Sequence, residues 1–274
     1  MSQQDSGNAA SLRAITTRNR DSWNQIAPRR HGEPASLFRD GGLTLEDYER
    51  ELAGDVTGKR VLHLACSNGD GVLSWASLGA IAAGADISEV AISKAVRKAA
   101  EAGIRAEFHC ADMFDLPPRL SRLDLIYLSW GAMCWVPDLD VFARVVAGRL
   151  RQHGSVLICD HHPVWEVLAV RAENRLAVTR DYFGRHRPGN PDDAKQPSGA
   201  RGEAGAPAFD AFVWPVSDVV MSLVRAGLRL DAFFEAPSPE ADGWPGLGDV
   251  AWPRIPAIYV IKATKTDPGP GAIS

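Results

Sequence analysis

The chain has 274 residues, 45% of them hydrophobic, and a net charge of −4 from 30 basic and 34 acidic side chains. This size and apolar content suffice for one core with or without a cap, and they exclude fibrous, collagen-like and wholly disordered proteins. Binding to nucleic acid through overall charge is disfavoured, because a phosphate backbone favours a basic surface.

The first thirty residues are polar and charged, and no uncharged stretch approaches the ~18 residues of a membrane-spanning helix. We therefore expect a soluble, cytoplasmic protein with neither a signal peptide nor an anchor. Four widely spaced cysteines, Cys66, Cys110, Cys134 and Cys159, form no C-x-x-C pair. They predict reduced, buried thiols and no metal site.

The N-terminal part divides into two segments. Residues 1–20 are rich in Ser, Gln, Asn, Asp and Arg, a composition that predicts a flexible arm. Residues 21–54 carry irregularly spaced large apolar side chains, which predict short helices forming a cap.

From residue 55 onward, short apolar runs alternate with helical patterns. The predicted strands are 60–65, 81–86, 105–110, 123–129 and 154–160, and the predicted helices are 72–78, 89–102 and 138–150. Strands that are apolar on both faces and separated by helices indicate parallel pairing, hence a doubly wound α/β sheet. We assign 55–163 and 215–265 to this Rossmann-like domain.

The alternation breaks after Asp160. Residues 164–214 are predicted to be a cap insertion: 161–183 has helical spacing, and 186–207 is rich in Pro, Gly and charge and predicts a mobile loop. A helix over 217–226 and strands over 228–235 and 258–263 follow; only a loop separates these two strands, so we expect them to pair antiparallel. Residues 266–274 form a tail.

The loop after the first strand is the first candidate for a ligand site, because open parallel sheets bind ligands outside the carboxyl ends of their strands. Residues 65–71 contain Gly69 and Gly71, which permit a sharp turn or a close approach of backbone amides to a ligand. Asp86 ends the second strand, where an exposed carboxylate could accept both hydroxyl protons of a ribose. A plain strand-to-helix turn remains the alternative for the glycines.

The same loop bears on the choice of cofactor. The G-x-G-x-x-G spacing of dinucleotide sites is absent, and Asp70 would repel a diphosphate at the helix N-terminus. A nucleoside with an amino-acid tail and a positive centre, S-adenosylmethionine, fits better. Asp112 could accept the adenine amine, with Met113 against the ring, or could merely cap a turn. Trp130 and Trp135 could form aromatic walls for a sulfonium or could belong to the core.

This order of motifs resembles the class I S-adenosylmethionine-dependent methyltransferases, in particular bacterial small-molecule enzymes with a Trp-containing N-terminal helix. The similarity runs from about Trp23 to Lys265. It implies a seven-stranded sheet whose last strand is antiparallel between its neighbours. The cofactor-binding residues it implies are Trp23, Asn24, Ala65, Cys66, Ser67, Gly69, Asp86, Ile87, Asp112, Met113, Ser129 and Trp130.

The sequence also departs from the family pattern. An acidic residue is usual at the position of His63, and glycines are usual at those of Ala65 and Ser67. His63 cannot replace a carboxylate in ordering the methionine ammonium, although Asp70 nearby could. These departures leave a catalytically silent, cofactor-binding regulatory module as one alternative, and a dinucleotide-dependent oxidoreductase as a weaker one.

Methyl transfer needs chiefly alignment of a nucleophile, exclusion of water and, for a phenol or ring N–H, removal of a proton. His162 is the first candidate base, because the enzymes that this chain resembles also carry a His-Pro pair at this position. His31 is the second candidate. The alternative is a histidine that only hydrogen-bonds its own loop. Trp135, His162, Tyr182 and Trp214 are the predicted acceptor-binding residues. We expect an enzyme of secondary metabolism that methylates N or O of a small aromatic or heterocyclic molecule. No sequence feature sets the oligomeric state.

Overall fold

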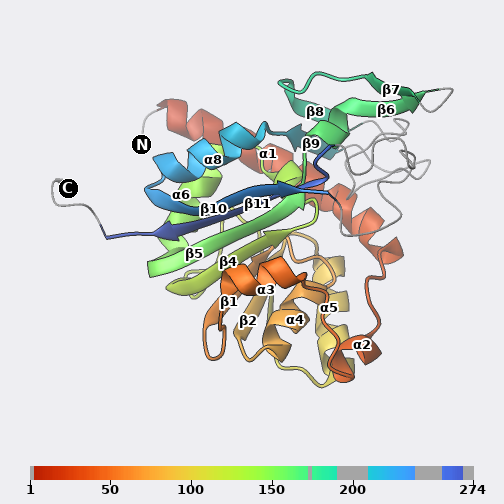
Figure 1. Ribbon diagram of the computed structural model, residues 1–274, viewed down its shortest axis with the longest axis vertical. Helices are drawn as coiled ribbons and strands as arrows, with labels where there is room; N and C mark the ends of the chain where they lie inside the picture. Colours follow the sequence, from red (N-terminus) through yellow and green to blue (C-terminus); the bar gives the residue numbers. More distant parts are fainter. Residues whose placement is uncertain (1–2, 172–174, 190–208, 238–254, 268–274) are drawn as a thin grey trace.

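The computed structural model describes residues 3–171, 175–189, 209–237 and 255–267. At its centre lies a seven-stranded sheet in the order β10-β11-β5-β4-β1-β2-β3 (Figure 1). Its strands are β1 Arg60–Leu64, β2 Ile81–Asp86, β3 Glu107–Cys110, β4 Leu123–Ser129, β5 Leu150–His161, β10 Leu228–Ala236 and β11 Ile258–Lys265. Strands β1 to β5 pair parallel, and β11 runs antiparallel between β5 and β10. The doubly wound sheet and its antiparallel last strand are thereby confirmed.

Helices cover both faces of the sheet, as its apolar strands require (Figure 1). One face carries α3 (Asp47–Ala53), α4 (Asp70–Ser77) and α5 (Glu89–Ala102); the other carries α6 (Leu139–Arg149) and α8 (Val216–Arg225). Helix α5 begins and ends as expected. The Ser88 hydroxyl accepts from the amide of Ala91 at 3.1 Å, and Gly103 ends the helix at φ 72°.

The N-terminal segment differs from the flexible arm expected over residues 1–20, because helix α1 spans Gln3–Ile26. Its inward face is polar, so apolar periodicity could not reveal it. Asn19 is buried there: its amide nitrogen donates to the carbonyl of Asp210 at 2.8 Å, and its side-chain oxygen accepts from the Asp210 amide at 2.7 Å. Arg18 also donates to the Asp210 carboxylate at 2.7 Å. A partner 191 residues away in sequence thus orders the segment.

The cap contains the short helices η1 (Ala27–Arg29) and α2 (Ala35–Arg39), which precede α3. The insertion after β5 is mostly extended, which corrects the helical spacing expected over 161–183. Its elements are α7 Val164–Val167, β6 Leu168–Arg171, β7 Arg175–Val178, β8 Arg185–Gly189 and β9 Phe209–Val213. Strands β6 and β7 pair antiparallel, as do β8 and β9. The expected mobile loop begins inside β8, and residues 190–207 of it lie outside the described residues.

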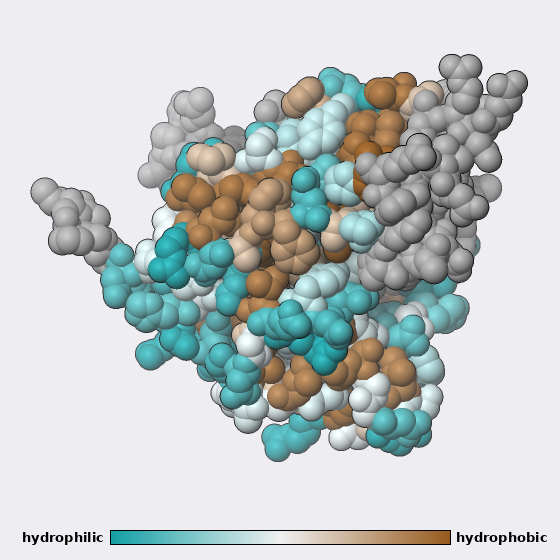
Figure 2. All heavy atoms as spheres, viewed as in Figure 1, coloured by the Kyte–Doolittle hydropathy of each residue, from teal (hydrophilic) through white to brown (hydrophobic). Residues whose placement is uncertain are grey.

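Exposed apolar side chains gather over α8 and β10, where Figure 2 shows a hydrophobic area. They include Met221 and Val224 of α8, and Leu230 and Phe233 of the edge strand β10. No helix in the described ranges is both long and apolar enough to span a membrane. The four cysteines are free; Cys66 and Cys159 are buried as expected, but Cys110 is exposed and Cys134 partly so.

Candidate functional site

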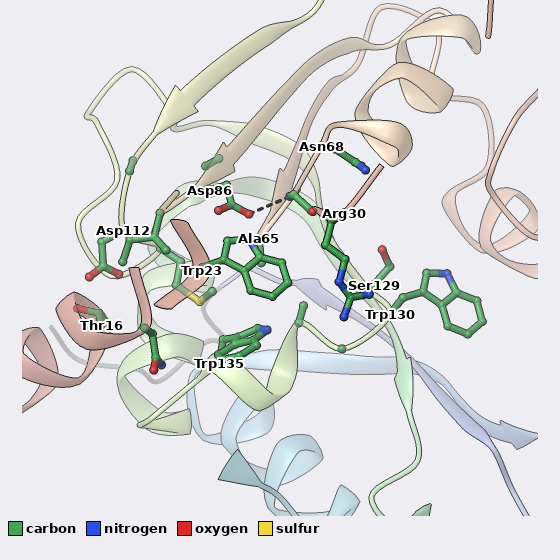
Figure 3. A pocket seen from close by; sticks show the side chains of 18 of the residues that line it. Thr16, Trp23, Arg30, Ala65, Asn68, Asp86, Asp112, Ser129, Trp130 and Trp135 are labelled. Atoms are coloured by element: carbon green, nitrogen blue, oxygen red, sulfur yellow. Dashed lines mark hydrogen bonds between the residues drawn. The ribbon is translucent and has the colours of Figure 1, made fainter. Parts of the chain in front are cut away.

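A cavity of about 270 Å³ opens at the carboxyl ends of β1, β2 and β4 (Figure 3). It lies where the strand order reverses, since β1 is flanked by β4 and β2. Its lining residues are Thr16, Asn19, Trp23, Arg30, Gly32, Ala65, Ser67, Asn68, Ala85, Asp86, Ile87, Ala111, Asp112, Met113, Phe114, Ser129, Trp130, Gly131, Ala132 and Trp135. The sheet supplies one wall, and α1 with the segment that follows it supplies the other.

The loop after β1 adopts the backbone of a glycine-rich loop without all of its glycines. Ala65 and Ser67 have φ values of 53° and 48°, in the left-handed region that favours glycine. At Gly69 the backbone approaches other elements closely, because a Cβ there would lie 2.9 Å from atoms of both Ala95 and Phe108. The backbone shape expected of this loop is therefore kept, at a conformational cost in Ala65 and Ser67.

Asp86 is buried rather than exposed, which corrects the sequence expectation. One carboxylate oxygen accepts from the amide of Ser67 at 2.8 Å, and the other accepts from the amide of Ser88 at 2.9 Å. Burial raises the pKa of this carboxyl from 3.8 to about 6, while the backbone hydrogen bonds oppose the shift. A carboxylate has about four acceptor positions and the backbone amides do not fill them all, so it can still accept a hydrogen bond from a ligand in the cavity.

The loops after β3 and β4 complete the sheet wall. Asp112 lines the cavity and also caps a turn, where its carboxylate accepts from the amide of Phe114 at 3.0 Å. Trp130 takes a left-handed conformation with φ 46° and has 36% of its surface exposed. A buried carboxylate, Asp160 at the end of β5, accepts from the amides of Gly131 and Met133 and so fixes this loop.

The opposite wall is aromatic. Trp23 of α1 lies 5.5 Å from Trp135, measured between ring centroids, and Trp135 lies 5.5 Å from Phe209 of β9. Trp135 ends the short helix η2 (Met133–Trp135), which follows β4. Trp23 and Trp135 thereby close this side of the cavity, with Phe209 packed behind Trp135, and Figure 3 shows the indoles of Trp23 and Trp135 beside the cavity.

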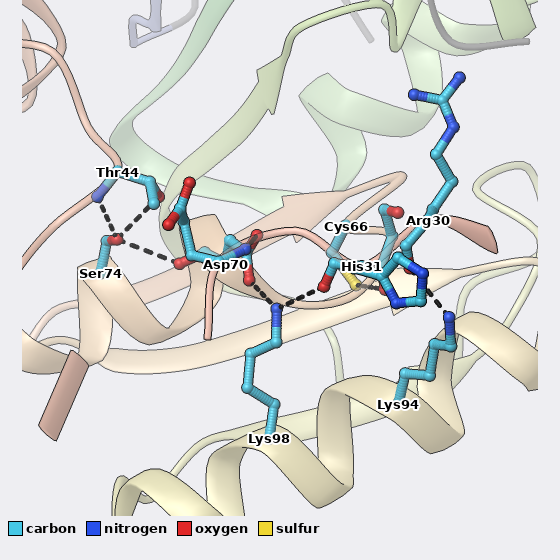
Figure 4. Close-up of polar contacts among 10 residues, drawn as sticks. Arg30, His31, Thr44, Cys66, Asp70, Ser74, Lys94 and Lys98 are labelled. Atoms are coloured by element: carbon cyan, nitrogen blue, oxygen red, sulfur yellow. Dashed lines mark hydrogen bonds and ion pairs between the residues drawn. The ribbon is translucent and has the colours of Figure 1, made fainter. Parts of the chain in front are cut away.

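Two lysines of α5 hold the segment that follows α1 (Figure 4). The ammonium of Lys94 donates to the carbonyls of Ala27, Pro28 and Arg30 at 2.6, 2.7 and 2.9 Å. Lys98 forms an ion pair with Asp70 and donates to the carbonyl of His31 at 3.4 Å. We call residues 27–33 the strap.

The strap places two cavity residues that sequence reasoning missed. Gly32 has φ 58°, and a Cβ there would lie 2.1 Å from the side-chain nitrogen of Asn68 and 2.2 Å from a carboxylate oxygen of Asp70. Arg30 is partly buried and points toward Ser129 (Figure 3). Burial lowers the pKa of its guanidinium, a group that stays charged at neutral pH.

The sequence predicts that Asp70 faces the ligand site, but the structure turns its side chain away from the cavity. Its carboxylate pairs with Lys98 and accepts from the amide of Glu33 at 2.9 Å, and Asp70 does not line the cavity. Its charge is balanced, so it cannot be the group that repels a diphosphate, nor can it order a ligand's ammonium. His63 is buried, and this burial lowers its pKa to about 3, so the ring is neutral; its Nε2 lies 3.3 Å from the hydroxyl of Ser129.

The cavity collects nine of the twelve predicted cofactor residues: Trp23, Ala65, Ser67, Asp86, Ile87, Asp112, Met113, Ser129 and Trp130. Asn24 lies behind it and accepts from the Ser88 hydroxyl at 2.6 Å, which joins α1 to the start of α5. Cys66 packs in the hydrophobic core, and the backbone of Gly69 lies close to Ala95 and Phe108.

The structure separates the predicted acceptor residues. Trp135 lines the cavity, whereas Trp214 lines a smaller hollow of about 40 Å³ beside it; Tyr182 lines neither. His162 also lines neither: its Nε2 lies 2.7 Å from the Glu235 carboxylate, and its Nδ1 accepts from the amide of Val164 at 3.2 Å. His31 is exposed and meets Lys98 through its carbonyl. Both histidines therefore make contacts that fix the chain around them, and neither lines the cavity.

Comparison with known proteins gives the class. Residues 61–154 match a family model described as a methyltransferase domain. A solved structure of an S-adenosylmethionine-dependent methyltransferase from Mesorhizobium loti is 22% identical, with a TM-score of 0.62 over 83% of this chain and 100% of that one. One from Methanosarcina mazei is 17% identical, with a TM-score of 0.58 over 82% and 99%. No curated protein matches the sequence.

The fold is thus that of the S-adenosylmethionine-dependent methyltransferases. Residues 61–154, which carry β1 to β4 and the start of β5, match the methyltransferase-domain model, and this match and the shared fold agree with the resemblance stated from the sequence. The same fold occurs in the 4+2 cyclase SpnF, which is 16% identical with a TM-score of 0.57 over 91% of this chain and 95% of that one. Fold alone therefore does not fix the reaction.

Proposed function

We propose that this protein transfers the methyl group of S-adenosylmethionine to N or O of a small aromatic or heterocyclic molecule in the cytoplasm, as a step of secondary metabolism. The observation that carries the proposal is Asp86: a buried carboxylate at the end of β2, held by two backbone amides and facing a cavity at the switch point of the sheet. Such a carboxylate suits a ribose.

The residues along the cavity fit the three parts of the cofactor. Ile87, Asp112 and Met113 adjoin Asp86 and suit the adenine, with Asp112 as acceptor for its amine. At the opposite end, the guanidinium of Arg30 suits the methionine carboxylate. With His63 neutral and Asp70 paired with Lys98, the ammonium would meet neutral acceptors such as the Ser129 hydroxyl.

The cofactor supplies a methyl group on a positive sulfur, and the chain's part is to align and enclose the acceptor. Trp23 and Trp135 close the cavity from the cap side and present aromatic faces, which suit a sulfonium because it has no N–H or O–H to satisfy. Fixing two reactants in an aligned geometry contributes roughly 7–11 kcal/mol of barrier reduction, so few catalytic side chains are needed.

A second candidate, a cofactor-binding protein that transfers no methyl group, is favoured by one feature. Among the described residues, the methionine end has no free carboxylate, since His63 is neutral and Asp70 is paired. A solved structure with the same fold is described as a 4+2 cyclase, so this fold also occurs in a protein named for a reaction other than methyl transfer.

Calorimetry with S-adenosylmethionine, S-adenosylhomocysteine and NAD tests the cofactor. We expect micromolar binding of the first two and none of NAD; binding of NAD alone would overturn the proposal. Incubation with radiolabelled cofactor and a library of phenols and nitrogen heterocycles then tests transfer. Binding without transfer to any acceptor supports the silent module.

A further inference from the structure

Helix α3 carries a buried carboxylate that the proposed function has not yet used. Glu49 is fully buried between α3 and the sheet. One of its oxygens accepts from the phenol of Tyr127 on β4 at 2.7 Å, and the other accepts from the amide of Glu46 at 2.8 Å. The contact with Glu46 belongs to the capping box of α3. The contact with Tyr127 is not needed to cap the helix, so it calls for a separate explanation.

The surroundings of Glu49 suit its ionised form but do not balance its charge. Burial raises the pKa of Glu49, and hydrogen bonds from Tyr127, Glu46 and Cys159 oppose the shift. A carboxylate only accepts hydrogen bonds, so three donors suit the charged form. Buried charges are normally paired with an opposite charge, but no lysine or arginine in the described part of the chain forms an ion pair with Glu49.

Tyr127 connects this carboxylate to Ser129, which lines the main cavity. The two residues are two positions apart on β4, so their side chains point to the same face of the sheet. Burial raises the pKa of the Tyr127 phenol well above its ordinary value, while a hydrogen bond with Ser129 opposes the shift. A hydrogen bond that lowers the pKa of a phenol is one donated to its oxygen. The Ser129 proton is therefore directed to Tyr127, and the Tyr127 proton to Glu49.

His63 fixes the remaining hydrogen bond of Ser129. Burial lowers the pKa of its ring to about 3, so the ring carries one proton at neutral pH. Its Nδ1 is buried and has no hydrogen-bond partner among the described residues, whereas its Nε2 lies 3.3 Å from the Ser129 hydroxyl. A proton on Nδ1 would be a buried, unpaired N–H, so the proton belongs on Nε2 and is donated to Ser129. The Ser129 oxygen thus keeps one lone pair for a ligand in the cavity.

We propose that Glu49 is the counter-charge for the methionine ammonium of the cofactor, acting through Tyr127 on the Ser129 oxygen that accepts from that ammonium. The inference rests on the proposed function, and it names the residue that takes over from the acidic side chain usual at the position of His63. Hydrogen bonds in a chain polarise one another in a low-dielectric interior, so the buried charge makes Ser129 a stronger acceptor than an isolated serine. Glu49 is a positioning residue, because it acts through other side chains.

The test compares two ligands by calorimetry: S-adenosylhomocysteine and its analogue without the α-amino group, which keeps the adenosine, the sulfur and the carboxylate. Glu49→Gln should lower the affinity for S-adenosylhomocysteine about tenfold and leave the affinity for the analogue unchanged, because only the first ligand has an ammonium. Tyr127→Phe keeps the carboxylate but interrupts the chain, and it should give the same selective loss. Glu51→Gln, at an exposed position of α3, is the matched control and should alter neither affinity.

Two results in Glu49→Gln would overturn the inference: an equal loss of affinity for both ligands, which a merely structural role produces, or no loss for either. Circular dichroism checks the fold of each variant. If Glu49→Gln does not fold, Tyr127→Phe decides by the same comparison of the two ligands. A failure of S-adenosylhomocysteine to bind the unaltered protein would instead overturn the proposed function, so the two failures are distinguishable.

Discussion

The two walls of the main cavity are built differently. The sheet wall is formed by strand ends and by the loops that follow them, and its key carboxylate, Asp86, is fixed by amides only 19 and 2 residues away in sequence. The cap wall is formed by α1 and the strap, which Asp210, Lys94 and Lys98 hold from 64 to 191 residues away.

This difference assigns cofactor recognition to the sheet wall and closure of the cavity to the cap wall. The sheet wall presents groups whose positions follow from the parallel strands themselves, as in any doubly wound sheet. The cap wall depends on a few long-range side-chain contacts, any one of which a single substitution can remove. We expect changes in the sheet wall to alter cofactor affinity most, and changes in the cap wall to alter stability and closure.

The largest effect is expected at Asp86. Asp86→Asn removes the charge that would accept the ribose hydroxyls, and hydrogen bonds to charged groups contribute about 1.5–3 kcal/mol each, so affinity for S-adenosylhomocysteine should fall about 100-fold. Calorimetry measures the loss, and circular dichroism checks the fold. An affinity equal to that of the unaltered protein would show that the sugar lies elsewhere.

The cap wall is tested by Lys98→Met. The Lys98 and Asp70 side chains are 10% and 19% exposed, so removing the cation leaves a largely buried carboxylate unpaired. We expect a loss of about 2 kcal/mol in the free energy of unfolding. Urea denaturation measures it. Arg97→Met, on the exposed face of the same helix, should cost little, and adding Asp70→Asn to Lys98→Met should recover part of the loss. Equal effects of Lys98→Met and Arg97→Met would refute a structural role for the ion pair.

The dependence of binding on pH sharpens the role of Asp86. Its pKa is raised to about 6, and the ionised form is the one that accepts ribose hydroxyls, so affinity for S-adenosylhomocysteine should fall about tenfold from pH 7 to pH 5. The same shift means that this group's contribution to folding stability falls as pH rises from about 4 to 6, because the folded state holds the proton longer. The Asp86→Asn variant should lose the dependence; its persistence would assign it to Asp160, whose pKa is also raised to about 6.

The smallest effect is expected in the loop after β1. Ala65→Gly and Ser67→Gly relieve left-handed conformations at φ 53° and 48° but add unfolded-state entropy, so each should stabilise the protein by about 0.5 kcal/mol. Thermal unfolding measures the gain. Ala91→Gly, inside α5, is the control and should destabilise by about 1 kcal/mol. Destabilisation by both loop variants would mean that the side chains of Ala65 and Ser67 stabilise the protein by more than their left-handed backbone conformations destabilise it.

Sequence patterns predict the sheet well, because its strands are apolar on both faces and its helices have ordinary caps. The limits of β2, β4 and α5 follow directly from Asp86, Ser129 and the Ser88–Gly103 pair. The part of helix α1 before residue 21 escapes prediction, since its buried face is polar and its partner, Asp210, lies in the insertion.

The residues of the site also divide into those that sequence patterns predict and those that they do not. Residues at strand ends, such as Ser67, Asp86 and Met113, are predictable because topology alone brings them together. Arg30 and Gly32 are not, because long-range contacts of the strap with Lys94, Lys98 and Asp70 place them. His162 follows a strand end too, but its ring turns toward Glu235 on β10, an orientation that no local pattern encodes.

The joint between Asn19 and Asp210 ties the amino-terminal helix to the insertion strand β9, while Trp135 touches both Trp23 and Phe209. Neither piece can swing away without breaking its hold on the other. Entry and departure of a nucleoside ligand would then proceed through one concerted opening. Ligand exchange would follow a single rate constant, and weakening the contacts of either piece would increase it.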